Sequence, residues 1–361
     1  MSQALGCVVL GAGLMGRLLA HALVRAGHQV TMHEARGPDA QGSAAWVAAS
    51  MLAPLAESAI TELPVVRMGQ HSLARWPALI AELPASVFFQ REGTVIVWHR
   101  QDAGDAKRFA DKLRETRTQL PALAAPQSLQ STDLAQLEPS LAHKFSQGLW
   151  LPEEGQLDNR QLLDALLASL TNSRADLHWH SPQALEDVQA DWVFDCRGLG
   201  SKPQWSGLRG VRGEVLRLHA PEVTLSRPVR LIHPRYPLYI APKENNLFVV
   251  GATEIETDDL SPASVRSSLE LLSAAYSVHS GFAEARILEI NVQARPTLPD
   301  NLPAIHLPRP GVMQINGLYR HGFLIAPAML DAALALMQGD TALAKQFGLL
   351  QPTPTPRGAR P

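Results

Sequence analysis

The first stretch of the chain has an apolar pattern that predicts a β-α-β unit. Residues 8–10 form a short apolar run typical of a buried strand. Apolar positions then recur at helical spacing over 14–26, and Gly27 is placed to end that helix. A second strand is predicted over 28–33, which completes the unit.

Helical spacing returns at several later places. It predicts helices over 64–83, 156–170, 261–276 and 328–337. The segment 102–141 is also polar and helical in pattern, but Pro121 and Pro126 interrupt it.

Strand-like runs occupy much of the remaining chain, and are predicted at 86–98, 175–180, 191–198, 210–253 and 285–292. The first of these is expected to be a hairpin turned at Glu92-Gly93, and "YIAPKENNLFVVGAT" a second hairpin turned at 244–246. The runs over 210–253 suit an antiparallel sheet. The Pro-rich tail "QPTPTPRGARP" is expected to be disordered.

Composition narrows the class of protein. A chain of 361 residues is too long for one small core and suggests two lobes. The formal charge is −2, and the basic residues are dispersed, so a nucleic-acid partner is not expected. No apolar run is expected to span a bilayer, and the opening segment suits a strand better than a signal peptide. Cys7 and Cys196 lie in apolar stretches and suggest a reducing, cytoplasmic location.

The motif "VVLGAGLMG" predicts a dinucleotide-binding loop. Gly11 permits a tight turn, Gly13 lets the backbone approach a pyrophosphate, and Gly16 lets the helix pack closely on the strand. The helix N-terminus supplies free N–H groups to the phosphates. Glu34 ends the second strand, where an acid binds ribose hydroxyls and disfavours the 2′-phosphate of NADP. NAD and FAD share this ADP half, so the motif alone leaves both open.

The segment "GSAAWVAASMLAPLAE" at 42–57 consists mostly of small residues with little charge. Small side chains let backbone N–H groups approach a large flat ring and its ribityl chain. An ordinary Ala-rich helix has the same composition, so the segment by itself leaves both interpretations open.

Several separated motifs together resemble the flavin-dependent D-amino-acid oxidases, and among them the glycine oxidases. They are the Gly-rich loop with Glu34, the small-residue segment through Met51 with Glu57, "YIAPK", "VGAT", "ARPTLPDNLP" and "GLYRHGFLIAP". The resemblance covers the chain from Cys7 to about Met337. It implies FAD, held non-covalently, because neither cysteine stands where sarcosine-oxidase relatives tether their flavin.

The resemblance also implies which residues contact the cofactor. Besides Gly11, Gly13, Gly16 and Glu34, they are Leu14, Met15, Ala35, Ala44, Ala45, Ala49, Ser50, Met51, Gln183, Leu318, Tyr319, Arg320, His321, Gly322, Phe323 and Leu324. Met51, Glu57 and Glu254 are expected in the substrate pocket. Ser50 stands where the family usually has glycine. Glu254 stands at a position that is apolar in a known glycine oxidase, and an acid there favours a more basic amine.

Two arginines and a tyrosine are the candidate catalytic residues. Arg295 is expected to follow a strand, and Arg320 to precede an apolar helix whose N-terminus faces the flavin. Guanidinium groups bind carboxylates through paired, charge-assisted hydrogen bonds, and with Tyr239 they suit an amino-acid carboxylate. Surface salt bridges are the alternative for each arginine. The resemblance implies that all three face the substrate.

The sequence therefore predicts an α/β protein, α+β overall, with a Rossmann-like lobe and a second lobe on an antiparallel sheet. The FAD-binding lobe is expected over 1–84, 145–208 and 292–350, the substrate lobe over 85–144 and 209–291, and a disordered tail over 351–361.

The expected function is oxidative deamination of glycine, related small amines or D-amino acids. Hydride passes to FAD, and O2 is reduced to H2O2. Thiamine synthesis is the implied context. The alternatives are an FAD-dependent dehydrogenase that acts on a bulkier or more basic amine with another electron acceptor, and a catalytically silent flavoprotein. His178 and His180 lack a third ligand, so no metal is expected. A homo-oligomer is left open.

Overall fold

The computed structural model describes residues 3–233 and 238–350, and the tail expected to be disordered lies outside them. A six-stranded sheet carries the N-terminal motif, in the order β16-β17-β10-β1-β2-β9. Its strands are β1 (Gly6–Leu10), β2 (Gln29–His33), β9 (Asp176–His178), β10 (Trp192–Asp195), β16 (Ala304–Arg309) and β17 (Val312–Asn316). All neighbours are parallel except β16 and β17. This is the predicted Rossmann-like sheet, and it confirms the mixed α/β class.

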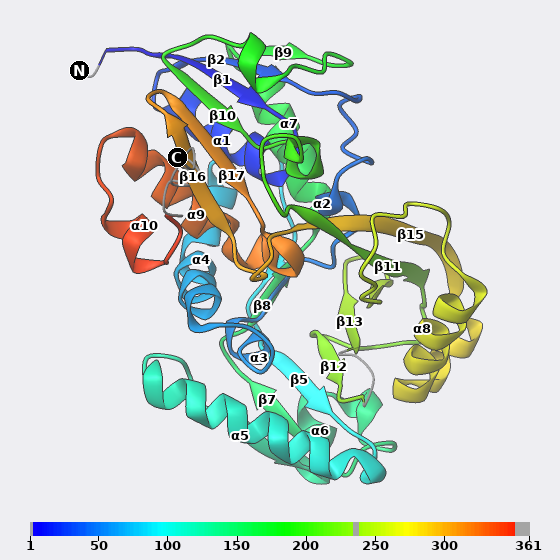
Figure 1. The fold of residues 1–361 in the computed structure, drawn as a ribbon. Coiled ribbons are helices and arrows are strands. Elements are labelled where there is room, and N and C mark those ends of the chain that lie inside the picture. Colours follow the sequence, from blue (N-terminus) through cyan, green and yellow to red (C-terminus); the bar gives the residue numbers. More distant parts are fainter. Residues whose placement is uncertain (1–2, 234–237, 351–361) are drawn as a thin grey trace, which may run out of the picture.

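A second sheet of eight strands has the order β15-β11-β14-β13-β12-β5-β7-β6. Its strands are β5 (Thr94–Val97), β6 (Gln127–Gln130), β7 (Gln147–Leu151), β11 (Arg209–His219), β12 (Val229–Leu231), β13 (Leu238–Pro242), β14 (Leu247–Gly251) and β15 (Arg286–Thr297). All neighbours are antiparallel except β5 and β12. In Figure 1 this sheet lies below the six-stranded one.

A third, small antiparallel sheet corrects one sequence prediction. It consists of β3 (Met51–Leu52), β8 (Gly155–Leu157) and β4 (Phe89–Gln90). The hairpin expected over 86–98 is wrong, because β4 pairs with β8 while β5 pairs with β7 and β12. The hairpin turned at 244–246 is confirmed, and Asn245 and Asn246 both adopt the left-handed conformation that this turn needs.

The helices follow the predicted pattern with shifted ends. They are α1 (Leu14–Arg25), α2 (Ala44–Val47), α3 (Pro54–Glu57), α4 (Leu63–Ala81), α5 (Ala103–Gln119), α6 (Ser131–Leu137), α7 (Asn159–Thr171), α8 (Val265–Val278), α9 (Gly322–Met337) and α10 (Ala342–Gln346). The helix predicted from 156 begins at Asn159, because residues 155–157 form β8 and the Asp158 side chain caps the N–H groups of Arg160 and Gln161.

The proposed lobes do not follow the sheets at every point. The strand β7 lies in a segment assigned to the FAD-binding lobe, and β15 crosses the boundary at 292, yet both pair in the eight-stranded sheet. The lobe boundaries therefore remain a proposal.

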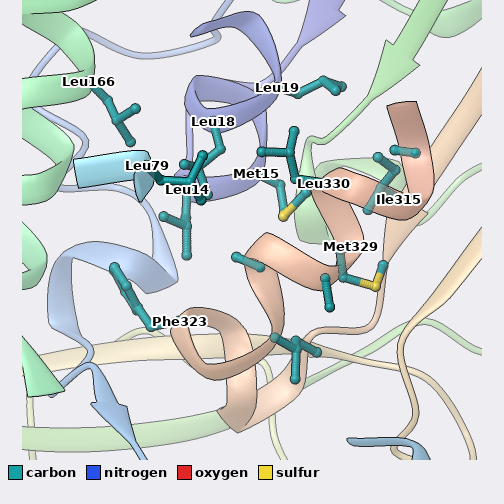
Figure 2. Packing of buried hydrophobic residues seen from close by; sticks show 14 of the residues in the cluster. Leu14, Met15, Leu18, Leu19, Leu79, Leu166, Ile315, Phe323, Met329 and Leu330 are labelled. Atoms are coloured by element: carbon teal, nitrogen blue, oxygen red, sulfur yellow. The ribbon is translucent and has the colours of Figure 1, made fainter. Parts of the chain in front are cut away.

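The largest apolar core holds α1 against α9. Leu14, Met15 and Leu18 of α1 belong to the same cluster as Phe323 and Leu330 of α9, and Figure 2 shows these side chains gathered between the helices. Each such side chain is at most 6% exposed, and burial of one contributes about 1.5–3 kcal/mol. This packing positions the start of both helices at one cavity.

One apolar segment is longer than the sequence analysis expected. Among the described residues, Tyr319–Met337 is one helix with the length and composition of a membrane span, and these two criteria alone do not contradict the expectation that no run spans a bilayer. Of the most apolar 18-residue stretch in this segment, 67% is buried inside the protein, as expected for a core helix.

Candidate functional site

A cavity of about 580 Å³ lies where the ends of β1, β2 and β10 meet β11, β13 and β15. All candidate site residues line it except Gly16, which lies behind the Gly-rich loop. The structure thus brings together residues separated by more than three hundred positions, such as Gly11 and Leu324. Their individual roles are inferred from the geometry below.

The Gly-rich loop has the conformation that the motif predicts. Gly11 has φ +94°, and a Cβ there would lie 2.8 Å from the carbonyl oxygen of Cys196. A Cβ on Gly16 would lie 1.8 Å from the carbonyl oxygen of Gly11. Gly13 precedes α1, and no side chain caps the first N–H groups of this helix. These groups face an open cavity and are therefore free to bind phosphate.

Glu34 lies where β2 ends, beside the same loop. One of its carboxylate oxygens accepts a hydrogen bond from the N–H of Ala12 at 2.7 Å, and the other accepts from the N–H of Arg36 at 2.9 Å. The two bonds fix the carboxylate at the cavity wall. Each oxygen retains a lone pair, so the geometry fits an acid that binds ribose hydroxyls.

Arg17 supports this end of the cavity, and the sequence analysis missed it. Its guanidinium is fully buried and donates to the carbonyl oxygens of Ala12, Leu163 and Pro38 at 2.8, 2.8 and 2.5 Å. It therefore ties the Gly-rich loop to α7 and to the segment after β2. Charged side chains are rarely fully buried, so its position next to Gly16 gave no usable signal.

The backbone conformation at Ser50 explains why a glycine is expected at this position. Its φ is +52°, a conformation that favours glycine, and it is buried. Its hydroxyl donates to the carbonyl oxygen of Leu157 at 2.5 Å, which offsets part of the strain. Ser50 therefore preserves the backbone path that a glycine would follow.

Lys243 holds the same segment in place and was also missed. Its ammonium donates to the carbonyl oxygens of Ala49 and Leu157 at 2.9 and 2.7 Å, and to the Gln156 side chain at 3.0 Å. Burial lowers the pKa of Lys243 to about 7. A lysine after "YIAP" carried no sign that it would point inward.

The N-terminus of α9 lies at Gly322, six residues before the predicted start at 328. Pro327 lies inside the helix and cannot donate to the carbonyl of Phe323. That carbonyl instead accepts from the Trp76 indole at 3.0 Å, and the N–H of Ala328 donates to the Ser72 hydroxyl at 3.1 Å. Side chains of α4 thus replace the bonds that proline disrupts. The uncapped first turn of α9 lines the cavity.

Arg295 lies within β15 rather than after a strand, which corrects that expectation. Its guanidinium donates to the carbonyl oxygen of Thr253 at 3.2 Å. Among the described residues, no carboxylate lies within 4.0 Å of it. Tyr239 of β13 lines the same part of the cavity, and no described residue hydrogen-bonds to its hydroxyl. Burial raises the pKa of Tyr239, so the hydroxyl remains a donor at neutral pH.

Arg320, by contrast, already has acidic partners. Its guanidinium lies 2.9 Å from a Glu254 oxygen and 3.4 Å from a Glu57 oxygen. Tyr319, with φ +48°, donates its hydroxyl to the other Glu254 oxygen. Of the two arginines, Arg295 is therefore the one with an uncompensated charge.

Glu57 connects the buried charges behind the cavity. It pairs with Arg230, which the sequence analysis did not identify, and lies 3.2 Å from Nδ1 of His321. Burial alone would raise the pKa of Glu57, but Arg230 and Arg320 hold it well below its ordinary value. Glu57 is therefore ionised and fixes these arginines.

The other candidates take minor places. Met51 of β3 lines the cavity, and the carbonyl of Gln183 accepts from Arg197 at 3.0 Å. His178 pairs with Asp176 and stacks on His33. Within residues 3–233 and 238–350, no group of three or more potential metal ligands is found.

Comparisons with known proteins agree with this geometry. The family model described as "DAO: FAD dependent oxidoreductase" matches residues 7–333. The chain is 42% identical to the Rhizobium etli "Putative thiamine biosynthesis oxidoreductase ThiO", over 89% of this chain and 93% of the relative. It is 24% identical to a Bacillus licheniformis "Glycine oxidase", over 92% and 93% of the two chains. The crystal structure of glycine oxidase from Geobacillus kaustophilus superposes with a TM-score of 0.78 at 23% identity, covering 94% and 96% of the chains.

Proposed function

Since the chain belongs to the DAO family of FAD-dependent oxidoreductases, we propose that it oxidatively deaminates glycine and related small amines or D-amino acids. The names of two relatives, a ThiO and a glycine oxidase, support this substrate class. The observation that carries the proposal is that Arg295 and the Tyr239 hydroxyl line one cavity, and that among the described residues Arg295 has no acidic partner and the hydroxyl has no hydrogen-bond partner.

The cavity fits FAD at both of its ends. The Gly-rich loop and the first turn of α1 would hold the pyrophosphate, and Glu34 would hold the adenosine ribose. Residues 44–51 and 318–324 would hold the flavin, and the positive N-terminus of α9 would stabilise its reduced, anionic form. When bound, FAD supplies the acceptor for the substrate's α-hydride and passes the electron pair to dioxygen, which yields H2O2.

We propose that FAD is held without a covalent link. Cys196 lies beside Gly11, at the phosphate end of the cavity, and Cys7 is buried in β1. Burial raises the pKa of both thiols, so neither forms the reactive thiolate readily.

The chain's own contribution to the reaction is positioning. The Arg295 guanidinium would bind the substrate carboxylate, and Tyr239 would donate a further hydrogen bond to it. Two contacts at the carboxylate fix the α-carbon, so one C–H bond is held in the reactive direction. The substrate would enter as the free amine, and its nitrogen lone pair would form the C=N bond as the α-hydride leaves. The nitrogen would then lose one proton to solvent, which balances the second proton of H2O2, and water would hydrolyse the imine to the oxo acid and ammonia or an amine. No described side chain is required as a dedicated base.

The test is anaerobic reduction of the purified yellow protein by an amine panel, followed by peroxide measurement in air. Glycine, sarcosine and small D-amino acids are expected to bleach the flavin absorbance, with one peroxide formed per amine consumed. A protein that stays oxidised with every amine would contradict the proposal.

A second candidate is a dehydrogenase that acts on a more basic amine with an acceptor other than oxygen. The sequence prediction that motivates it is the acid Glu254, which is exposed at the cavity but accepts hydrogen bonds from Tyr319 and Arg320. Rapid reduction by amines with negligible peroxide in air, but turnover with an artificial acceptor, would identify this alternative. In either case we propose a cytoplasmic enzyme, and the name of the Rhizobium relative suggests thiamine synthesis as its context.

A further inference from the structure

The residues Tyr319, Glu254 and Arg320 form a bonded group at the substrate end of the cavity, here called the Glu254 cluster. Both Glu254 oxygens are used, one by the Tyr319 hydroxyl and one by the Arg320 guanidinium. The side chain of Glu254 is 40% exposed, against 8% for Glu57. Glu254 is therefore the solvent-exposed acid at this end of the cavity, and Glu57 is the buried one.

The charged side chains around the Glu254 cluster leave one guanidinium group available to bind an anion. Arg230 is paired with Glu57, and Arg320 lies between Glu57 and Glu254. Among the described residues at this end of the cavity, three guanidinium groups face two carboxylates, and Arg295 is the one without an acid. One substrate carboxylate would neutralise the charge of Arg295. A second carboxylate would lie next to the negative charge of Glu254 and would find no unpaired guanidinium group.

We propose that Glu254 is a specificity-determining residue, which restricts the site to amines with one carboxylate by occupying the guanidinium of Arg320. The inference rests on the proposed function and defines its substrate class. It differs from the sequence expectation that Glu254 attracts a basic amine. Each oxygen of Glu254 is held by one donor, and the charge of Glu254 is balanced by Arg320, so Glu254 attracts a cationic substrate less than an unpaired acid would.

Replacement of Glu254 changes this balance in a defined way. In Glu254→Gln the side chain keeps its size but loses its charge. The side of the Arg320 guanidinium that faces the cavity then no longer has an acidic partner. A second carboxylate on the ligand can then pair with Arg320 through charge-assisted hydrogen bonds. Glu254→Asp keeps the negative charge next to Arg320, so it is expected to keep the preference for ligands with one carboxylate.

The first measurement is ligand binding to the oxidised holoenzyme, read from the shift of the flavin absorbance. Acetate carries one carboxylate and malonate two, and neither is a substrate for amine oxidation. In Glu254→Gln the dissociation constant of malonate is expected to fall by about tenfold or more, while that of acetate changes less than about threefold. Glu256→Gln is the matched control, because Glu256 lies on the same loop but pairs with Arg209 outside the cavity. It should leave both constants unchanged.

The second measurement is the kcat/KM of iminodiacetate and D-aspartate relative to glycine, which should rise in Glu254→Gln and not in Glu254→Asp. Unchanged malonate binding in a folded, flavin-loaded Glu254→Gln protein would overturn the inference, as would equal tightening of acetate and malonate. Selective loss of cationic amines would instead identify Glu254 as a recruiter of basic substrates. The binding measurement needs no turnover, so it tests the role of Glu254 even if the protein oxidises no amine.

Discussion

Replacement of Arg295 tests the carboxylate site most directly. In Arg295→Ala the cavity loses the one guanidinium at its substrate end that has no acid within 4.0 Å among the described residues. The Thr253 carbonyl that Arg295 contacts borders the cavity and can be hydrated, so the fold should tolerate the change. In Arg295→Lys the charge remains, but the planar fork that binds both carboxylate oxygens is lost.

The magnitude follows from the bonds that are removed. A hydrogen bond to a charged group contributes about 1.5–3 kcal/mol, and a buried two-point contact lies at the upper end of that range or above it. A loss of about 3 kcal/mol corresponds to a rise of roughly 100-fold in the dissociation constant of glycine or acetate. Lysine retains the positive charge, so in Arg295→Lys the dissociation constant is expected to rise by only about tenfold.

The assay is anaerobic stopped-flow titration of the flavin absorbance with glycine, which separates binding from the limiting rate of reduction. If Arg295 also orients the α-carbon, the limiting rate in Arg295→Ala falls together with affinity. The control is Arg209→Ala, since Arg209 lies on the neighbouring strand β11 but contacts Glu256 and Asn301 outside the cavity. A flavin-loaded Arg295→Ala protein with unchanged affinity and rate would refute the reasoning.

Two further predictions concern the cofactor loop and the buried acid Glu154. The Gly11→Ala protein should lose FAD on gel filtration, because the new Cβ would clash with the backbone of Cys196. Gly27 also has a positive φ, but a Cβ there would meet open space. The Gly27→Ala protein should therefore keep FAD and lose only about 1 kcal/mol of unfolding free energy. Burial raises the pKa of Glu154 from 4.5 to about 7, so its contribution to stability is complete below pH 4.5 and is lost as pH rises to 7. Urea unfolding should therefore show that Glu154→Gln gains about 3 kcal/mol relative to the unmodified protein between pH 5 and 8, and identical pH profiles would contradict this.

The elements that could be predicted are those whose signals lie close together in sequence. The β-α-β unit needs only an apolar run, a glycine turn and a helical repeat within thirty residues, and the structure confirms it at β1, α1 and β2. The hairpin turned at Asn245 and Asn246 is equally local, since turn chemistry alone sets its register.

Elements that depend on distant partners could not be predicted in this way. The segment 86–98 contains two strands and a glycine between them, so its local pattern matches a hairpin. Its strands separate because β8 and β7, more than fifty residues later, offer each a different neighbour. Likewise Pro327 marks a helix boundary in sequence, but Trp76 and Ser72 satisfy the groups it leaves unpaired, and α9 continues through it.

The same limit applies to the charges of the candidate site. Sequence motifs identified both Arg295 and Arg320 as carboxylate binders and favoured Arg320 as the more important, because the pattern around each contains no information about its neighbours in space. In the fold, β15 carries Arg295 to a position where its hydrogen-bond partners among the described residues are carbonyl oxygens, while the turn before α9 places Arg320 beside Glu57 and Glu254. An arginine attracts a ligand carboxylate strongly only where its charge is uncompensated. We therefore propose different functions for the two arginines: Arg295 would bind the substrate carboxylate, and Arg320, while held by Glu254, would limit the substrate to that one carboxylate.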